Sequence, residues 1–144
     1  LCCDIVLAAQ SATFIQAFSK IGLVPDSGGT FFLPRLIGWQ KASALMMLGD
    51  KVEAEEAEKM GMIYKVFQDE SFVAESLAIA ETLAQMPTKA LKEKKKLLSN
   101  SFSSNWSEQL FLEDVAQQKA AKTDDYKEGI AAFLEKRKPV FKGR

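Results

Sequence analysis

The stretch Gly22–Thr30, G-L-V-P-D-S-G-G-T, decides how this chain is interpreted. It places the carboxylate of Asp26 between an apolar run ending at Pro25 and a glycine pair that opens a predicted helix. An Asp ahead of a helix often caps it, which stabilises the helix by about 1 kcal/mol. A carboxylate among apolar residues can instead accept a proton from carbon, because desolvation raises its pKa. On local pattern alone, both roles stay open for Asp26.

Three other patterns each allow a structural and a functional interpretation. Gly28-Gly29 fits a tight turn, or the close approach of a ligand to the backbone. The lysine-rich run Lys89–Lys96 fits a solvated helix face, with phosphate binding as the alternative. The stretch Glu128–Arg144 is amphipathic and then basic. It fits a surface helix with a cationic end, or a segment that docks on a partner subunit or an anionic ligand.

The order of patterns along the chain predicts an α/β protein with a helical second half. Strands and helices alternate in the first region, whereas the second contains only helical patterns. The expected strands are Ile5–Ala8, Ala12–Phe14 and Ile63–Phe67, and the expected helices are Gly28–Leu36, Gln40–Leu48, Ala54–Met60, one beginning after Ser71, Lys89–Leu98, Trp106–Ala121 and one capped by Thr123 or Asp124. Because Leu1–Ala8 reads as a buried strand, we expect the chain to be the C-terminal part of a longer protein.

Composition excludes several classes of function. The 144 residues are 47% apolar, and nineteen basic side chains balance nineteen acidic ones, so no overall charge favours nucleic acid or an anionic membrane. With no histidine, the chain cannot form a Ser-His-Asp site or a histidine-ligated metal site. Adjacent Cys2 and Cys3 cannot form an ordinary disulfide, which suits a reducing, cytoplasmic compartment. Both thiols are expected to be inert within an apolar strand.

Several motifs, in order and over essentially the whole chain, resemble the enoyl-CoA hydratase/isomerase (crotonase) family. They are C-D-I-V-L-A-A (Cys3–Ala9), A-T-F (Ala12–Phe14), Gly22–Thr30, L-P-R-L-I-G (Leu33–Gly38), L-G-D-K-V-E-A-E-E-A (Leu48–Ala57), G-M-I-Y-K-V (Gly61–Val66) and the tail E-G-x-x-A-F-x-E-K-R-x-P-x-F from Glu128. The resemblance is strongest to the phenylacetate-pathway isomerase branch of the family.

The resemblance implies a spiral of ββα turns followed by a helical trimerisation region. Residues 1–67 would be the end of the spiral core and carry the catalytic carboxylate. Residues 68–144 would be the helical region that oligomerises and contacts coenzyme A. The family's oxyanion-hole peptide groups would lie in a segment before Leu1, so the chain alone is expected to be inactive.

The resemblance also assigns roles to individual residues. Family hydratases carry a second catalytic glutamate where this chain has Phe18, and phenylalanine cannot transfer a proton. Asp26 matches the carboxylate position used by several family isomerases, which makes it the expected catalytic residue. Phe18, Pro25, Phe133 and Lys136 are the expected substrate-binding residues, the last two at the adenine and phosphates of coenzyme A.

The implied activity is an acyl-CoA isomerase. A single Asp would move a proton on a thioester, converting the ring epoxide of phenylacetyl-CoA to an oxepin, or a 3-enoyl-CoA to its 2-enoyl isomer. No cofactor or metal is expected, since coenzyme A is part of the substrate. The implied assembly is a homotrimer or a dimer of trimers, without nucleic acid or membrane. The alternatives are another crotonase-type hydratase or hydrolase, and a non-catalytic trimerising pseudoenzyme.

Overall fold

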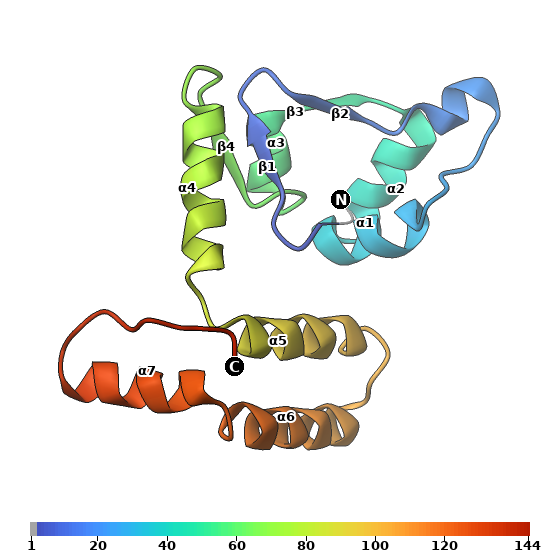
Figure 1. Cartoon of the computed structure of the whole chain (residues 1–144). Helices are drawn as coiled ribbons and strands as arrows, with labels where there is room; N and C mark the ends of the chain where they lie inside the picture. Colours follow the sequence, from blue (N-terminus) through green and yellow to red (C-terminus); the bar gives the residue numbers. More distant parts are fainter. Residues whose placement is uncertain (1–2) are drawn as a thin grey trace. The chain divides into compact units, whose positions relative to one another are not determined.

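The computed structural model describes residues 3–144, which form two compact units, one ending at Leu77 and the other running from Ala78 to Arg144 (Figure 1). This boundary falls inside a helix, whereas the division into 1–67 and 68–144 is one of function and stays a prediction. The elements are β1 (Leu7–Ala9), β2 (Thr13–Ile15), the 3-10 helix η1 (Ala17–Ile21), α1 (Gly29–Ile37), α2 (Trp39–Leu48), β3 (Lys51–Glu53), α3 (Ala54–Lys59), β4 (Lys65–Phe67), α4 (Phe72–Ala84), α5 (Thr88–Asn100), α6 (Trp106–Ala120) and α7 (Asp124–Leu134).

The first unit contains two small two-stranded sheets. Strands β1 and β4 pair in parallel with Ala8 opposite Val66, while β2 and β3 pair antiparallel with Phe14 opposite Val52. Strand β1 begins two residues later than the predicted strand Ile5–Ala8 and ends one residue later. Residues 3–5 are irregular and exposed, and Leu1 and Cys2 lie outside the described residues. Cys3 is exposed rather than within a strand, so the apolar strand environment expected for it is wrong.

A hydrophobic core fills the first unit between its helices and strands. Its buried members come from β1, α1, α2, β3, α3 and the turn before β4: Ala8, Leu33, Ile37, Ala42, Val52, Ala54, Ala57, Met62 and Ile63. Met46 and Met60 pack against this cluster, whereas Met47 is 74% exposed. Helix α2 ends at Leu48, as predicted, because Gly49 caps it with a left-handed backbone. Helix α3 ends at Lys59, one residue before the predicted end, and Gly61 with φ of 79° follows its C-cap Met60.

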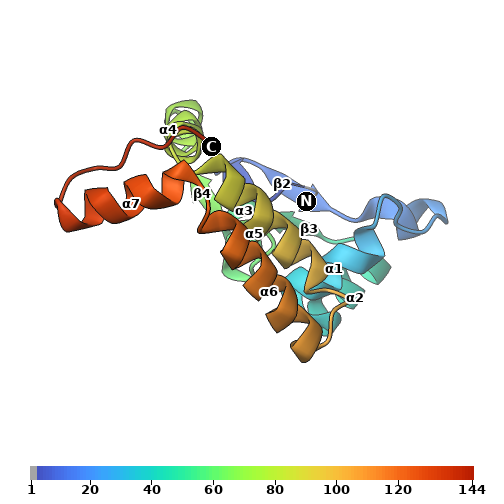
Figure 2. The same cartoon turned by 60° about the horizontal axis from the view of Figure 1, so that its bottom comes forward.

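The second unit is helical. Helices α5 and α6 lie side by side and are joined by a short connection, and α7 follows α6 after a brief turn (Figures 1 and 2). The Asn105 side chain caps α6 by accepting a hydrogen bond from the Glu108 N–H at 3.0 Å. Thr123, one of the two predicted caps, begins α7 by accepting from the Tyr126 N–H at 3.1 Å.

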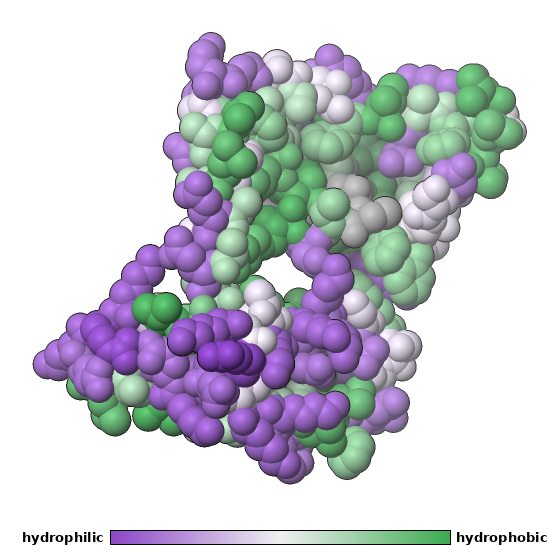
Figure 3. All heavy atoms as spheres, in the orientation of Figure 1, coloured by the Kyte–Doolittle hydropathy of each residue, from purple (hydrophilic) through white to green (hydrophobic). Residues whose placement is uncertain are grey.

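Apolar helix faces remain exposed in both units. Val73 and Leu77 on α4 are 66% and 58% exposed, and Ile130 on α7 is 44% exposed. In the view of Figure 3, hydrophobic side chains gather on the first unit, and hydrophilic ones cover much of the second. Such faces are typical of surfaces that contact other protein segments.

Candidate active site

The segment that carries Asp26 leaves η1 and returns to α1. Gly22 ends η1 with φ of 72°, and the Leu23 N–H donates to the Phe18 carbonyl at 2.9 Å. The chain then runs irregularly through the half-buried Pro25 to the exposed Asp26. Phe18, Pro25 and Asp26 therefore belong to one local stretch of the first unit.

A tight turn fixes the backbone at Asp26. The Gly29 N–H donates to the Asp26 carbonyl at 2.9 Å, and φ is 52° at Ser27 and 79° at Gly28. Positive φ at both central positions is the signature of a type I′ turn. A Cβ atom on Gly28 would lie 3.1 Å from the Phe32 ring, so both this tight contact and the positive φ favour glycine here. This supports the tight-turn interpretation of the glycine pair.

Asp26 is not the cap of α1. The N-cap position belongs to Gly28, and no side chain makes a capping hydrogen bond there. Within residues 3–144, the Asp26 carboxylate forms no hydrogen bond or ion pair. Capping, the structural alternative to catalysis, is therefore excluded, and the carboxylate is available to a ligand.

The dry setting expected around Asp26 is not formed within the described part of the chain. Ile21, Leu23 and Val24 are 71%, 60% and 78% exposed. They lie in η1 or the irregular segment after it, and no described element covers them. Phe31 and Phe32 meet edge to face at 5.2 Å at the start of α1, but each remains partly exposed. Apolar residue types alone did not predict this openness.

The two substrate-binding residues expected in the tail lie together at the end of α7. Phe133 is 82% exposed, so it does not fill the interior of the second unit. Lys136 has a left-handed φ of 55°, and its N–H donates to the Phe133 carbonyl at 3.3 Å. An exposed aromatic ring and an exposed ammonium thus come from the same helix end, three residues apart.

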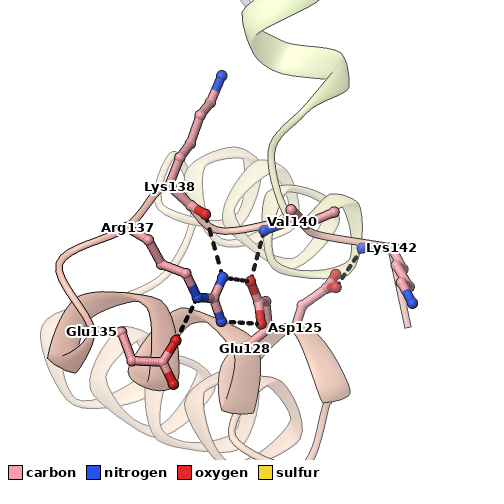
Figure 4. A network of polar contacts seen from close by, with 7 residues as sticks. All are labelled: Asp125, Glu128, Glu135, Arg137, Lys138, Val140 and Lys142. Carbon is pink, nitrogen blue, oxygen red and sulfur yellow. Dashed lines mark hydrogen bonds and ion pairs between the residues drawn. The ribbon is translucent and has the colours of Figure 1, made fainter.

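Residues on both sides of Phe133 and Lys136 in the chain form a polar network (Figure 4). The Arg137 guanidinium contacts both Glu128 carboxylate oxygens at 2.6 and 3.0 Å and reaches Glu135 at 2.6 Å. The Val140 N–H adds a hydrogen bond of 2.8 Å to Glu128. The hydrogen bonds from Arg137, followed by the one from Val140, lower the pKa of Glu128 to about 2.

Asp125 anchors the last residues of the chain. Its side chain is buried, with the residue only 4% exposed, and accepts hydrogen bonds from the N–H groups of Lys142 and Gly143 at 2.7 and 2.8 Å. Its own N–H donates to the Arg144 carbonyl at 3.0 Å. The sequence does not reveal this anchor. An Asp in the first turn of a helix is common, because it interacts favourably with the helix dipole, so its position alone does not indicate a partner elsewhere in the chain.

The described residues contain no group of three or more His, Cys, Asp or Glu side chains that could hold a metal ion. Over the same residues, every helix is too short or too polar to cross a membrane.

Comparison with known proteins finds one family model, described as enoyl-CoA hydratase/isomerase, that matches residues 1–144. The chain is 43% identical over 141 residues to 1,2-epoxyphenylacetyl-CoA isomerase of Escherichia coli (strain K12), covering 98% of the chain and 54% of that protein. It is 37% identical over 141 residues to trans-2-decenoyl-acyl-carrier-protein isomerase of Streptococcus mutans, covering 98% of the chain and 54% of that protein.

Solved structures show the same fold. A crystal structure of enoyl-CoA hydratase from Bacillus anthracis matches with a TM-score of 0.94 at 33% identity, covering 99% of this chain and 55% of that one. An enoyl-CoA hydratase from Polaromonas sp. JS666 matches with a TM-score of 0.92 at 34% identity, covering 97% and 55%. The chain thus spans about half the length of the relatives it matches.

Proposed function

Because the chain belongs to the enoyl-CoA hydratase/isomerase (crotonase) family, we propose that it is the catalytic-carboxylate part of an acyl-CoA isomerase. Its fold is the C-terminal part of the crotonase fold. One observation carries the proposal of isomerase chemistry: the Asp26 carboxylate stands at a rigid turn without capping α1 and without a partner in the described residues.

In the proposed reaction, Asp26 is both base and acid. Its carboxylate removes a proton from one carbon of an allylic or ring-epoxide thioester and returns it at another carbon. The charge that develops on the thioester oxygen needs hydrogen-bond donors. In this proposal, they come from a segment of the complete protein outside these residues. Phe18 supports a single-carboxylate route, because its side chain cannot transfer a second proton.

The substrate is proposed to be a coenzyme A thioester. Its acyl group would be the ring epoxide of phenylacetyl-CoA, as suggested by the name of the Escherichia coli relative, or a 3-enoyl chain. Phe18 and Pro25 would contact the acyl side of the ligand. Phe133 would stack on the adenine and Lys136 would meet a phosphate, consistent with the exposure of both side chains at the end of α7.

The complete protein is proposed to assemble as a homotrimer or a dimer of trimers in the cytoplasm, and to act in phenylacetate or fatty-acid catabolism. The exposed apolar stripe of α4, with Val73 and Leu77, supports burial against further protein. Other relatives are hydratases, so hydration by the same carboxylate is the competing reaction. A pseudoenzyme that only trimerises is the non-catalytic alternative.

The test compares the wild type, Asp26→Asn and Asp50→Asn in the complete protein that contains this chain. Asp50 is also exposed, so its variant controls for the loss of one negative charge. Isomerisation of both candidate thioesters should fall by about 10²-fold or more in Asp26→Asn, because proton transfer by a positioned side chain contributes roughly that much. It should persist in Asp50→Asn. Full turnover by Asp26→Asn would sink the proposal, and a hydrated product from the wild type would favour the hydratase.

A further inference from the structure

A concave site lies wholly within the second unit, formed by α5, the end of α6, the start of α7 and the last residue. The cleft has a volume of about 560 Å³. Its lining is mainly charged: Lys89, Lys92, Glu93, Lys119, Ala120, Lys122, Thr123, Asp124 and Arg144. We call it the cationic cleft. None of its residues belongs to the proposed catalytic or coenzyme A contacts.

The cationic cleft concentrates positive charge that the rest of the chain balances. Five cationic side chains and two carboxylates line it, an excess of three, whereas the whole chain has a formal net charge of zero. Both carboxylates already have partners outside the cleft lining. Glu93 pairs with Lys96 at 3.0 Å, and Asp124 pairs with Lys127 at 3.4 Å.

The lysines of the cleft are not neutralised in the same way. Among the described residues, Lys89, Lys92, Lys119 and Lys122 form no ion pair within 4.0 Å. The pKa of Glu93 is lowered, chiefly by its hydrogen bond with Lys96, and further by the charges of Lys119 and Lys92. Ammonium groups from two different walls therefore act on the same carboxylate. A concave surface focuses such charge and raises the local concentration of anions.

The arrangement of these cations indicates the shape of the ligand. Lys89 and Lys92 belong to α5, whereas Lys119 ends α6 and Lys122 lies in the turn that follows. Two linked anionic groups can form charge-assisted hydrogen bonds with cations on both walls at once. We propose that the cationic cleft binds a compact ligand with two linked phosphate groups. The diphosphate of a coenzyme A thioester and a free diphosphate-bearing metabolite share this chemistry.

The test measures binding of inorganic pyrophosphate to the complete protein by calorimetry at low salt. The variant Lys92→Gln/Lys122→Gln removes one cation from each wall. Its matched control is Lys59→Gln/Lys94→Gln, which removes the same charge at two exposed lysines outside the cleft lining. We expect the cleft variant to bind pyrophosphate about tenfold more weakly and the control to stay within about twofold. Thermal unfolding shows that each variant is folded, and Lys89→Gln/Lys119→Gln serves as a second cleft variant.

Two further binding measurements identify the source of the phosphates and separate this proposal from the catalytic one. Coenzyme A that displaces pyrophosphate assigns the cleft to the substrate, whereas simultaneous binding assigns it to a separate metabolite. Asp26→Asn should bind pyrophosphate as the wild type does, whatever its turnover. Absence of saturable pyrophosphate binding, or an equal loss in cleft and control variants, would overturn the proposal.

Discussion

Arg137 holds Glu128 through two hydrogen bonds, 2.6 and 3.0 Å long, between a residue just after α7 and one inside it. The two residues are nine positions apart, so this is not a pair between neighbouring turns of one helix. It holds the segment after α7 against the helix that precedes it. The same carboxylate accepts a hydrogen bond from the Val140 N–H, which fixes the direction of the segment after Arg137.

The first prediction concerns the pH dependence of this pair. The pKa of Glu128 is about 2 in the folded protein, below its ordinary value of 4.5, chiefly because of its hydrogen bonds with Arg137. Its stabilising effect is therefore complete above about pH 4.5 and is lost as the pH falls toward 2. The difference in unfolding free energy between wild type and Glu128→Gln should be constant near neutral pH and shrink across that acid range. Denaturant titrations at several pH values measure it, and a difference that grows in acid would contradict the expectation.

The second prediction concerns the buried anchor. Asp125→Asn replaces one acceptor oxygen with an amide N–H that faces a backbone donor, so we expect a loss of about 1–3 kcal/mol in unfolding free energy. Asp124→Asn is the control, because Asp124 makes only an exposed ion pair with Lys127 at 3.4 Å. Equal stability of the two variants in urea would show that the hydrogen bonds to Lys142 and Gly143 contribute little.

The third prediction concerns the turn at Asp26. Gly28→Ala places a Cβ 3.1 Å from the Phe32 ring at a φ of 79°, whereas Gly22→Ala has a similar φ of 72° but open space. Left-handed backbone alone costs a non-glycine residue about 1–2 kcal/mol. Gly28→Ala should therefore destabilise more than Gly22→Ala and should also lower kcat, since it displaces Asp26. Unfolding and steady-state kinetics of the complete protein measure both effects.

The fourth prediction concerns the exposed end of α7. Phe133→Ala and Lys136→Gln should raise KM for a coenzyme A thioester several-fold and leave kcat nearly unchanged, because contacts to the nucleotide do not change during the reaction. Leu134→Ala is the control, as Leu134 is also largely exposed, at 73%, and is adjacent in the chain. A rise in KM common to all three variants would indicate disturbance of the helix instead.

Local signals predicted most of the helices. Local patterns place α2, α3 and α6 within one or two residues and give the start of α7, because caps such as Thr123 and Gly49 act on their own segment. Strand partners did not follow from local pattern, since the pairing of Ala8 with Val66 joins distant parts of the chain. The resemblance predicted the family and fold correctly.

The candidate site follows less completely from the sequence. The catalytic role of Asp26 stays a prediction, and its exposure depends on what covers Leu23 and Val24, which residue types do not encode. The Glu128–Arg137 pair escaped detection because its spacing matches neither helical nor strand periodicity. The charge of Lys89–Lys96 was noticed, but Lys119 and Lys122 join Lys89 and Lys92 around the cationic cleft only through the packing of α5 against α6.

The tail after α7 shows that irregular backbone need not be loose. Val140, Lys142 and Gly143 belong to no helix or strand, yet each donates its amide to a carboxylate of α7. We therefore expect these three amide hydrogens to exchange with solvent deuterium more slowly than backbone amides without a hydrogen-bond partner. Hydrogen exchange can therefore measure, amide by amide, how often the last described residues detach from the carboxylates of α7.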